Sequence, residues 1–325
     1  MTMDNKEFDV VALGELLVDF TQNGLSEQGN TLFEANPGGA PANVLAMLRK
    51  LGKSCAFIGK VGKDSFGDML ARTVADAGID IRGLMRDPVI PTTLAVVHTF
   101  PNGDRDFSFY RKPGADILLR PDELDEGLLS SCRIFHFGTL SLTDEPCKAA
   151  TVRAYELAKA AGALISFDPN LRPPLWPDEA TAKAAIEWGL ARCDILKISD
   201  NEIEFMTGET DFDKGAAILQ ERYPNIRLLN VTAGGDGSFS YYGGKRVFVP
   251  ACKLGGVIET TGAGDTFCGS VLNFVLEHGL DGLGEDDMRA MLRFANTAAY
   301  IVTTKKGAIR SMPEREQVEE LLKKI

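Results

Sequence analysis

The sequence predicts a single α/β domain over residues 1–325, in which a mainly parallel sheet is covered by helices on both faces. The first indication is that short apolar segments alternate with helical patterns from about residue 132 onward. The second is that no repeat, low-complexity tract or Pro/Ser-rich linker divides the chain. Strands connected through helices pair in parallel, because the chain must cross back over the sheet before the next strand begins.

The first half of the chain predicts two core strands, two helices and two strand pairs. Residues 8–14 form an apolar, β-branched run that is typical of a strand buried on both faces. The other expected elements are a strand over 54–61, helices over 38–51 and 66–77, a hairpin-like excursion within 16–33, and strands over 92–100 and 105–111. The two hairpin regions are expected to form a separate flap.

The second half predicts the alternating part of the sheet and a helical C-terminal region. Its expected strands cover residues 133–137, 163–167, 194–198 and 226–231, with helices over 145–161, 180–191 and 212–222. Residues 239–242 and 246–249, separated by Gly243-Gly244, indicate an antiparallel hairpin. Helices are expected over 264–278, 286–303 and 314–324.

The composition excludes several classes of partner. Lys and Arg number 35 against 46 Asp and Glu, which gives a formal net charge of −11. Nucleic acids and anionic membrane surfaces are bound by clustered cations, so neither is an expected partner. No run approaches the roughly 20 apolar residues of a membrane span. The six dispersed cysteines form no Cys-x-x-Cys pair, which indicates reduced thiols in a cytoplasmic protein.

The most informative segment is Glu259-Thr260-Thr261-Gly262-Ala263-Gly264-Asp265, which stands just before an apolar helical run. Such a helix start presents free N–H groups at the positive end of the helix dipole, and glycines let a phosphate approach them. An Asp beside this anion hole can take a proton from an incoming hydroxyl. The alternative is a glycine-rich loop in which Asp265 only caps the helix.

A second segment, Gly38-Gly39-Ala40-Pro41-Ala42-Asn43, predicts contact with a small polar ligand. The two glycines allow a ligand to touch the backbone, and the amide of Asn43 both donates and accepts, which suits a sugar hydroxyl. Asp19 lies between apolar residues and is interpreted as a buried carboxylate that grips hydroxyls. The alternative for Asp19 is a solvated turn.

Further polar groups follow predicted strands, at the sheet edge where α/β proteins bind ligands. Glu202 follows one strand and is a candidate to hold Mg²⁺ through water, or else a first-turn helix residue. Arg172 follows another and is a candidate clamp for a phosphate or sugar oxygen. Residues 231–237 end a third in a glycine-rich turn suited to a nucleotide. Neither common nucleotide loop is complete, since Met47 and Phe267 stand where glycines are required.

These motifs resemble those of the ribokinase-like carbohydrate kinases and, among them, the fructokinases. Gly38-Gly39 through Asn43, together with Gly59-Lys60-Val61-Gly62-Lys63-Asp64 and Gly67, resembles the N-terminal signature of that family. Thr261-Gly262-Ala263-Gly264-Asp265 resembles the C-terminal signature. The resemblance covers nearly the whole chain. It implies a three-layer α/β/α sandwich with a small β lid over about residues 15–35 and 92–112.

The resemblance also implies the reaction, which is ATP-dependent phosphorylation of fructose to fructose 6-phosphate with Mg²⁺. The acceptor alternatives are ribose, 2-keto-3-deoxygluconate or a riboside, and the alternative of another class is a catalytically silent scaffold. The implied catalytic residues are Asp265, Gly262, Ala263 and Gly264. The implied sugar contacts are Asp19, Gly38, Gly39, Asn43, Phe107, Arg111 and Arg172. The implied ATP contacts are Lys197, Thr232, Gly234, Gly237, Gly264 and Asn296.

The metal sites and the assembly follow from the same resemblance. Glu202 corresponds to a residue linked to Mg²⁺, while Glu259, Thr261, Gly307 and Ser311 correspond to a loop that holds K⁺ in related kinases. The chain departs from the family pattern at Ser199, where Asn is common, at Glu259, where Asp is usual, and at Arg310, where Pro is common. The first departure leaves the water network around Mg²⁺ open, and the second leaves K⁺ dependence open. A homodimer formed through the lids is expected.

Overall fold

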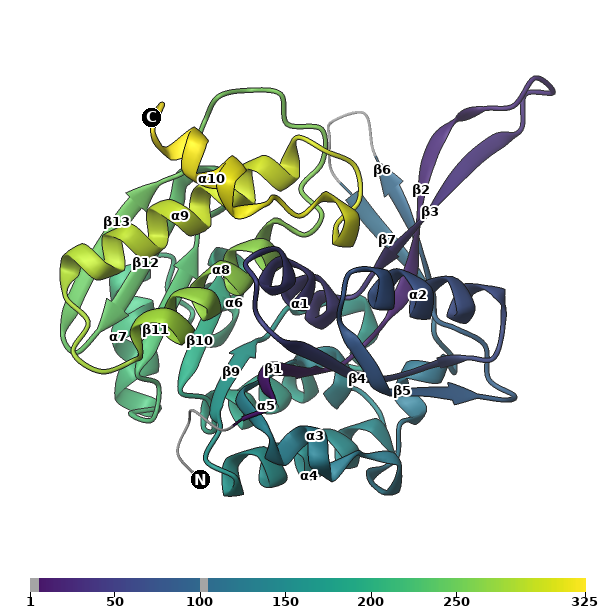
Figure 1. Cartoon of the computed structure of the whole chain (residues 1–325), viewed down its shortest axis with the longest axis horizontal. Coiled ribbons are helices and arrows are strands. Elements are labelled where there is room, and N and C mark those ends of the chain that lie inside the picture. Colours follow the sequence, from purple (N-terminus) through teal and green to yellow (C-terminus); the bar gives the residue numbers. More distant parts are fainter. Residues whose placement is uncertain (1–5, 100–104) are drawn as a thin grey trace.

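The computed structural model describes residues 6–99 and 105–325 and contains a nine-stranded main sheet (Figure 1). Its strands in spatial order are β13 (Lys245–Pro250), β12 (Gly237–Tyr242), β11 (Leu228–Thr232), β10 (Ile195–Ser199), β9 (Leu164–Asp168), β8 (Cys132–Gly138), β1 (Phe8–Leu13), β4 (Cys55–Gly62) and β5 (Asp80–Asp87). The strands from β11 to β5 pair in parallel, and β12 and β13 add an antiparallel hairpin.

Helices cover both faces of this sheet, so that β1 is buried on both sides. Val10 and Ala12 face one hydrophobic core, whereas Val11 and Leu13 face the other. The first core is covered by α1 (Ala40–Lys50), α2 (Ser65–Asp76), α8 (Ala263–His278), α9 (Glu285–Thr303) and α10 (Arg315–Leu322). The second is covered by α3 (Glu126–Ser130), α4 (Cys147–Ala160), α5 (Glu179–Leu190), α6 (Asp200–Thr207) and α7 (Phe212–Arg222). The predicted α/β/α sandwich is confirmed.

A second sheet of four strands stands beside the main one. Its order is β3 (Thr31–Gly38), β2 (Leu17–Leu25), β6 (Leu94–Thr99) and β7 (Arg105–Tyr110). The β2–β3 hairpin projects from the body of the molecule (Figure 1). Its base is anchored by Phe20, whose ring meets that of Phe66 edge-on, with 5.6 Å between the ring centroids. This sheet is the small β layer of the predicted fold class.

Two elements differ from the sequence prediction. Strand β3 runs on to Gly38, because Gly38 pairs with Leu17 and leads directly into α1. Strand β5 was not predicted, since charged residues at both of its ends mask the apolar pair Leu84 and Met85. Within residues 6–99 and 105–325, no helix combines the length and apolar character needed to cross a membrane.

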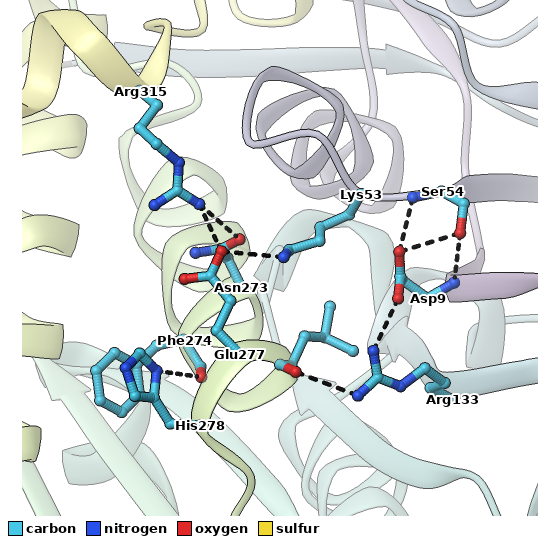
Figure 2. A network of polar contacts seen from close by, with 10 residues as sticks. Asp9, Lys53, Ser54, Arg133, Asn273, Phe274, Glu277, His278 and Arg315 are labelled. Carbon is cyan, nitrogen blue, oxygen red and sulfur yellow. Dashed lines mark hydrogen bonds and ion pairs between the residues drawn. The ribbon is translucent and has the colours of Figure 1, made fainter. Parts of the chain in front are cut away.

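A network of hydrogen bonds and ion pairs lies at the end of the sheet opposite the carboxyl ends of its parallel strands (Figure 2). Arg133 of β8 donates to the Asp9 carboxylate of β1 at 3.0 Å and to the carbonyl of Leu276 in α8 at 3.1 Å. Glu277, the next residue of α8, pairs with Lys53 at 3.0 Å and with Arg315 of α10 at 2.6 Å. The network therefore ties two strands to the C-terminal end of α8.

Substitution of Arg133 with methionine is expected to lower the free energy of unfolding by about 1 kcal/mol, since the pair of Arg133 and Asp9 is partly solvated. The kcat and KM should stay unchanged because this end of the sheet lies opposite the cavity described below. Urea unfolding combined with steady-state kinetics measures both quantities. The matched control is Arg153→Met, which removes an exposed pair with Glu126 and should leave the stability unchanged. A large change in kcat for Arg133→Met would contradict a purely structural role for this residue.

Candidate active site

A cavity of about 700 Å³ lies between the second sheet and the carboxyl ends of the main strands, where ligands bind in α/β proteins. The second sheet and the main body both contribute to its wall. The polar side chains around it include Glu15, Asp19, Asn36, Asn43, Arg172, Lys197, Glu202, Glu259 and Asp265. Most residues predicted to contact a sugar and the predicted base therefore meet in one place, although they come from distant parts of the chain.

Helix α8 begins at this cavity, and its first residues are fixed by close packing. Gly262 is the N-cap with φ of 79°, a left-handed conformation that favours glycine, and a β-carbon there would lie 2.8 Å from Cβ of Ala308. No side chain caps the helix, so its positive end faces the cavity uncovered by a cap. The amide of Ala263 donates to the Thr260 carbonyl at 3.2 Å, so this member of the predicted anion hole is engaged within the turn.

Asp265 lies in the first turn of α8 and is only 8% exposed. One of its carboxylate oxygens accepts a hydrogen bond from Nδ2 of Asn43 at 2.7 Å. Burial raises the pKa of Asp265, while Asn43, Lys197 and Arg172 act in the opposite direction. A carboxylate whose pKa is raised in this way is a stronger base than an exposed one, as a general base requires.

Asp19 of β2 and the glycines that precede α1 form the wall of the cavity on the side of the second sheet. Burial raises the pKa of Asp19 to about 7, and Arg172 partly opposes this rise. A β-carbon at Gly38 would lie 2.6 Å from a carboxylate oxygen of Asp19. Gly39 has φ of 134°, and a β-carbon there would lie 2.3 Å from the Glu15 carbonyl oxygen. Gly39 therefore requires glycine, whereas a larger residue at Gly38 would displace the Asp19 carboxylate.

Glu15 is a cavity residue that the sequence prediction missed. It is 5% exposed, and its carboxylate accepts from the amide of Ala40, the first residue of α1, at 2.8 Å. Because Gly39 has no side chain, Glu15 supplies the acceptor that the N-terminus of α1 would otherwise lack. Burial raises the pKa of Glu15 to about 7. The sequence signal that could have identified Glu15 is an acidic residue two positions after the end of a buried apolar strand.

Lys197 of β10 lies beneath the start of α8. Its ammonium is 3.1 Å from one carboxylate oxygen of Asp168 and 3.2 Å from the other, and both side chains are buried. A β-carbon at Gly264 would lie 3.2 Å from Nζ of Lys197, so the cation sits beside the predicted anion hole. Burial disfavours the ammonium, but Asp168 and Glu202 more than offset this effect and raise the pKa of Lys197. It therefore carries a fixed positive charge.

Glu202 joins two segments at the cavity. Its two carboxylate oxygens accept from the amides of Ser199 at 2.8 Å and Leu171 at 2.7 Å. Each oxygen keeps a second lone pair, so the carboxylate can still bind a water of hydrated Mg²⁺. In the part of the chain that the structure describes, no group of three or more His, Cys, Asp or Glu could hold a metal. The donors present suit Mg²⁺ held mainly by water and phosphate.

Two residues predicted to contact the sugar, one in the second sheet and one directly after it, are not placed at the cavity wall by the described contacts. Arg111 does not line the cavity: its guanidinium donates to Asp116 at 2.7 Å, Leu140 O at 2.8 Å and Thr143 at 3.0 Å. These contacts bury Arg111, because the chain turns inward directly after β7, so the expectation that it closes over a sugar is corrected. Phe107 of β7 pairs with Val97 of β6, but the contact predicted for its side chain lies outside the described part of the protein.

Of the predicted nucleotide residues, Lys197 and Gly264 line the main cavity. Thr232, Gly234 and Gly237 lie between β11 and β12 or at their ends, outside the wall of that cavity. Gly237 has φ of 127°, and a β-carbon there would lie 2.2 Å from the Val249 carbonyl oxygen. Asn296 of α9 donates to the carbonyls of Val249 at 3.0 Å and Pro250 at 3.2 Å, and accepts from Ser238 at 2.8 Å. It also lines a second cavity of about 410 Å³. Thr232 and Gly234 flank the same turn.

The residues predicted for a monovalent cation come from two neighbouring loops. Glu259 accepts from the amide of Gly307 at 2.6 Å, which joins these loops. Ser311 donates to the carbonyl of Lys306 at 2.5 Å. Thr261 follows Glu259 and lines the main cavity. The two loops are therefore linked at the start of α8.

Comparison with known proteins gives the family. The pattern of the pfkB family carbohydrate kinases matches residues 7–315. The probable fructokinase-2 of Arabidopsis thaliana is 44% identical over 312 residues, which cover 95% of this chain and 94% of that protein. Fructokinase of Xylella fastidiosa, solved with bound ATP, has a TM-score of 0.88 at 31% identity and covers 97% of this chain and 98% of its own.

A double mutant of fructokinase from Vibrio cholerae O395, solved with fructose, ADP and potassium ion, has a TM-score of 0.85 at 28% identity. The match covers 98% of this chain and 99% of that one. These matches extend over the main sheet, the second sheet and the cavity between them. The resemblance inferred from the motifs is thus confirmed, and the chain belongs to the pfkB family of carbohydrate kinases.

Proposed function

We propose that this protein transfers the γ-phosphoryl group of ATP to fructose and forms fructose 6-phosphate, with Asp265 as the general base. The observation that carries the proposal is a buried carboxylate in the first turn of a helix whose uncapped start opens into a cavity beside Asp19. The full-length similarity to proteins named fructokinase supports fructose as the acceptor. Membership of a carbohydrate kinase family supports the reaction class.

One set of residues is proposed to bind the sugar, and another is proposed to bind the phosphoryl group. Asp19, Asn43 and Arg172 hold the sugar so that its primary hydroxyl faces Asp265, which takes the proton as the bond to phosphorus forms. The start of α8 and the ammonium of Lys197 stabilise the charge on the transferring phosphoryl group. Mg²⁺, which arrives with ATP, supplies further positive charge at the phosphates, and Glu202 would hold it through water.

The remaining assignments rest on the placement of their residues. The purine is proposed to occupy the second cavity beside Asn296, next to the glycine-rich turn at Gly234 and Gly237. The linked loops of Glu259 and Ser311 are the proposed site for K⁺. Leu25, Leu32 and Phe33 are exposed on the β2–β3 hairpin, which supports a homodimer formed through the lids. The free cysteines support a cytoplasmic location.

The identity of the acceptor is tested by an assay of ADP release over fructose, ribose, 2-keto-3-deoxygluconate, a riboside and mannose. The expected result is that fructose gives the highest kcat/KM and that ³¹P NMR identifies fructose 6-phosphate. If ribose or the keto acid gave a higher kcat/KM than fructose, that compound would be the acceptor in place of fructose. Binding of fructose and ATP by calorimetry without any product would favour a silent scaffold instead.

The affinity for fructose is expected to rise between pH 6 and pH 8. Because the pKa of Asp19 is raised to about 7, this carboxyl is protonated below that pH and ionised above it. An ionised carboxylate accepts hydroxyl hydrogen bonds more strongly, so Kd should fall roughly 3–10-fold over this range. Calorimetry at fixed ionic strength measures this change. Asp19→Asn should weaken binding and remove the pH dependence, whereas an unchanged pH dependence in that variant would assign the titration to another group.

A further inference from the structure

We propose that Asn43 is a positioning residue for the general base, which holds the Asp265 carboxylate in the orientation that leaves its second oxygen for the sugar hydroxyl. This inference rests on the proposed function and gives Asn43 a role besides contact with the sugar. Nδ2 of Asn43 is 2.7 Å from Oδ2 of Asp265, and both residues are buried, at 4% and 8% exposure. The bond joins α1 to α8 across 222 residues of sequence.

The orientation of the Asn43 amide follows from the charge of its partner. An ionised carboxylate accepts hydrogen bonds only, so the amide nitrogen must face Asp265. The reversed amide would place two oxygens against each other. With the nitrogen engaged, Oδ1 of Asn43 is buried and has no hydrogen-bond partner among the described residues. A buried acceptor without a partner is costly, and a hydroxyl of the sugar would satisfy it.

The backbone brings the two residues together without a flexible element. The backbone N–H of Asn43 donates to the Gly39 carbonyl at 2.9 Å, so Asn43 belongs to the first turn of α1. One turn beyond Asp265, the absence of a side chain at Gly269 lets the helices touch. A β-carbon at Gly269 would lie 2.9 Å from both the Val44 carbonyl oxygen and Cβ of Met47. Groups carried by closely packed helices are held more accurately than groups on loops.

The other charged or titratable groups around Asp265 act on its charge but are not hydrogen-bonded to it in the contacts described above. They are Asp19 on β2, Asp168 on β9, Arg172 after β9, Lys197 on β10 and Cys268 on α8 itself. Burial raises the pKa of Asp265, and Asn43 lowers it ahead of Lys197 and Arg172. Asn43 therefore combines two effects on the base: it fixes the direction of the carboxylate and favours the ionised form.

The test compares the wild type with Asn43→Leu, which keeps the size of the side chain and removes the hydrogen bond. The acidic limb of the kcat–pH profile is expected to move up by about one pH unit, with kcat about tenfold lower below the midpoint. Asn43→Asp should move the limb further, because two neighbouring carboxyl groups then share a proton. If Asn43→Leu does not fold, the Asp variant, which has nearly the same volume, carries the test.

A second readout does not depend on turnover. The carboxyl ¹³C resonance of Asp265, identified by its absence in Asp265→Asn, should titrate at higher pH in both Asn43 variants than in the wild type. A raised KM for fructose with an unmoved pH limb and an unmoved resonance would overturn the positioning role. Absence of sugar phosphorylation by the wild type would instead overturn the proposed function itself.

Discussion

Substitution of Asp265 with alanine is expected to lower kcat for fructose phosphorylation by about 10²–10⁴, because the sugar hydroxyl then has no base to accept its proton. The effect should fall on kcat rather than on the Kd of ATP, since the start of α8 and Lys197 remain in place. The stability should change little, because relief of the burial that disfavours this charge offsets the loss of the hydrogen bond from Asn43. Rapid-quench measurement of a single turnover isolates the chemical step from product release.

Asp265→Asn provides the matched control, because it keeps the volume and removes only the basicity. We expect it to be as slow as Asp265→Ala. A variant that turned over at a near-normal rate would remove Asp265 from the role of base. A large loss of ATP affinity with an unchanged single-turnover rate would place Asp265 on the nucleotide side instead.

Substitution of Lys197 with methionine is expected to reduce both stability and activity. The ammonium and the Asp168 carboxylate are buried together, with side-chain exposures of 9% and 3%. Without the ammonium, Asp168 must either stay charged in the core or bind a proton, and loss of one partner of a buried pair costs about 3–5 kcal/mol of unfolding free energy. The kcat/KM for ATP should also fall, because the phosphoryl group loses the cation beside the start of α8.

The loss of stability should depend on pH. Burial already raises the pKa of Asp168 to about 7, and Lys197 opposes this rise. Without Lys197 the folded protein keeps a proton on Asp168 that the unfolded chain loses above about pH 4. The variant should therefore become progressively less stable as the pH rises from about 4 through 8. Urea unfolding at pH 5 and pH 8 measures the difference.

The double variant Lys197→Met/Asp168→Asn separates the two effects. It should regain most of the lost stability, because no buried charge is left unpaired, but it should not regain activity. Recovery of full activity would show that Lys197 acts only by balancing Asp168. A single Lys197→Met variant as stable as the wild type at pH 8 would contradict the buried pair.

The sequence predicted most of the core because its local signals agree with one another. The alternation of apolar strands with helices in the second half of the chain matches the order β8 to β11. The start of α8 was predictable because a glycine stands where the backbone takes a left-handed φ, at Gly262. The meeting of Asn43 with Asp265 was not predictable from the sequence, since it depends on the close contact of two distant helices at Gly269.

The errors concern side chains whose partners are set by the tertiary fold. Arg111 follows an edge strand, and nothing local shows that it turns toward the carbonyl of Leu140. Glu15 caps a helix that begins 25 residues later in the chain. Strand β5 carries charged residues at both ends, so its short apolar stretch gave too little periodicity to identify it.

A crystal structure with fructose and a non-hydrolysable ATP analogue tests the central claim most directly. We predict that the sugar lies between Asp19 and Asp265, with its primary hydroxyl within hydrogen-bonding distance of the Asp265 carboxylate. The terminal phosphate should lie at the start of α8, in line with that hydroxyl and beside Lys197. A sugar bound elsewhere, or a phosphate kept from the helix start by protein side chains, would contradict the assignment.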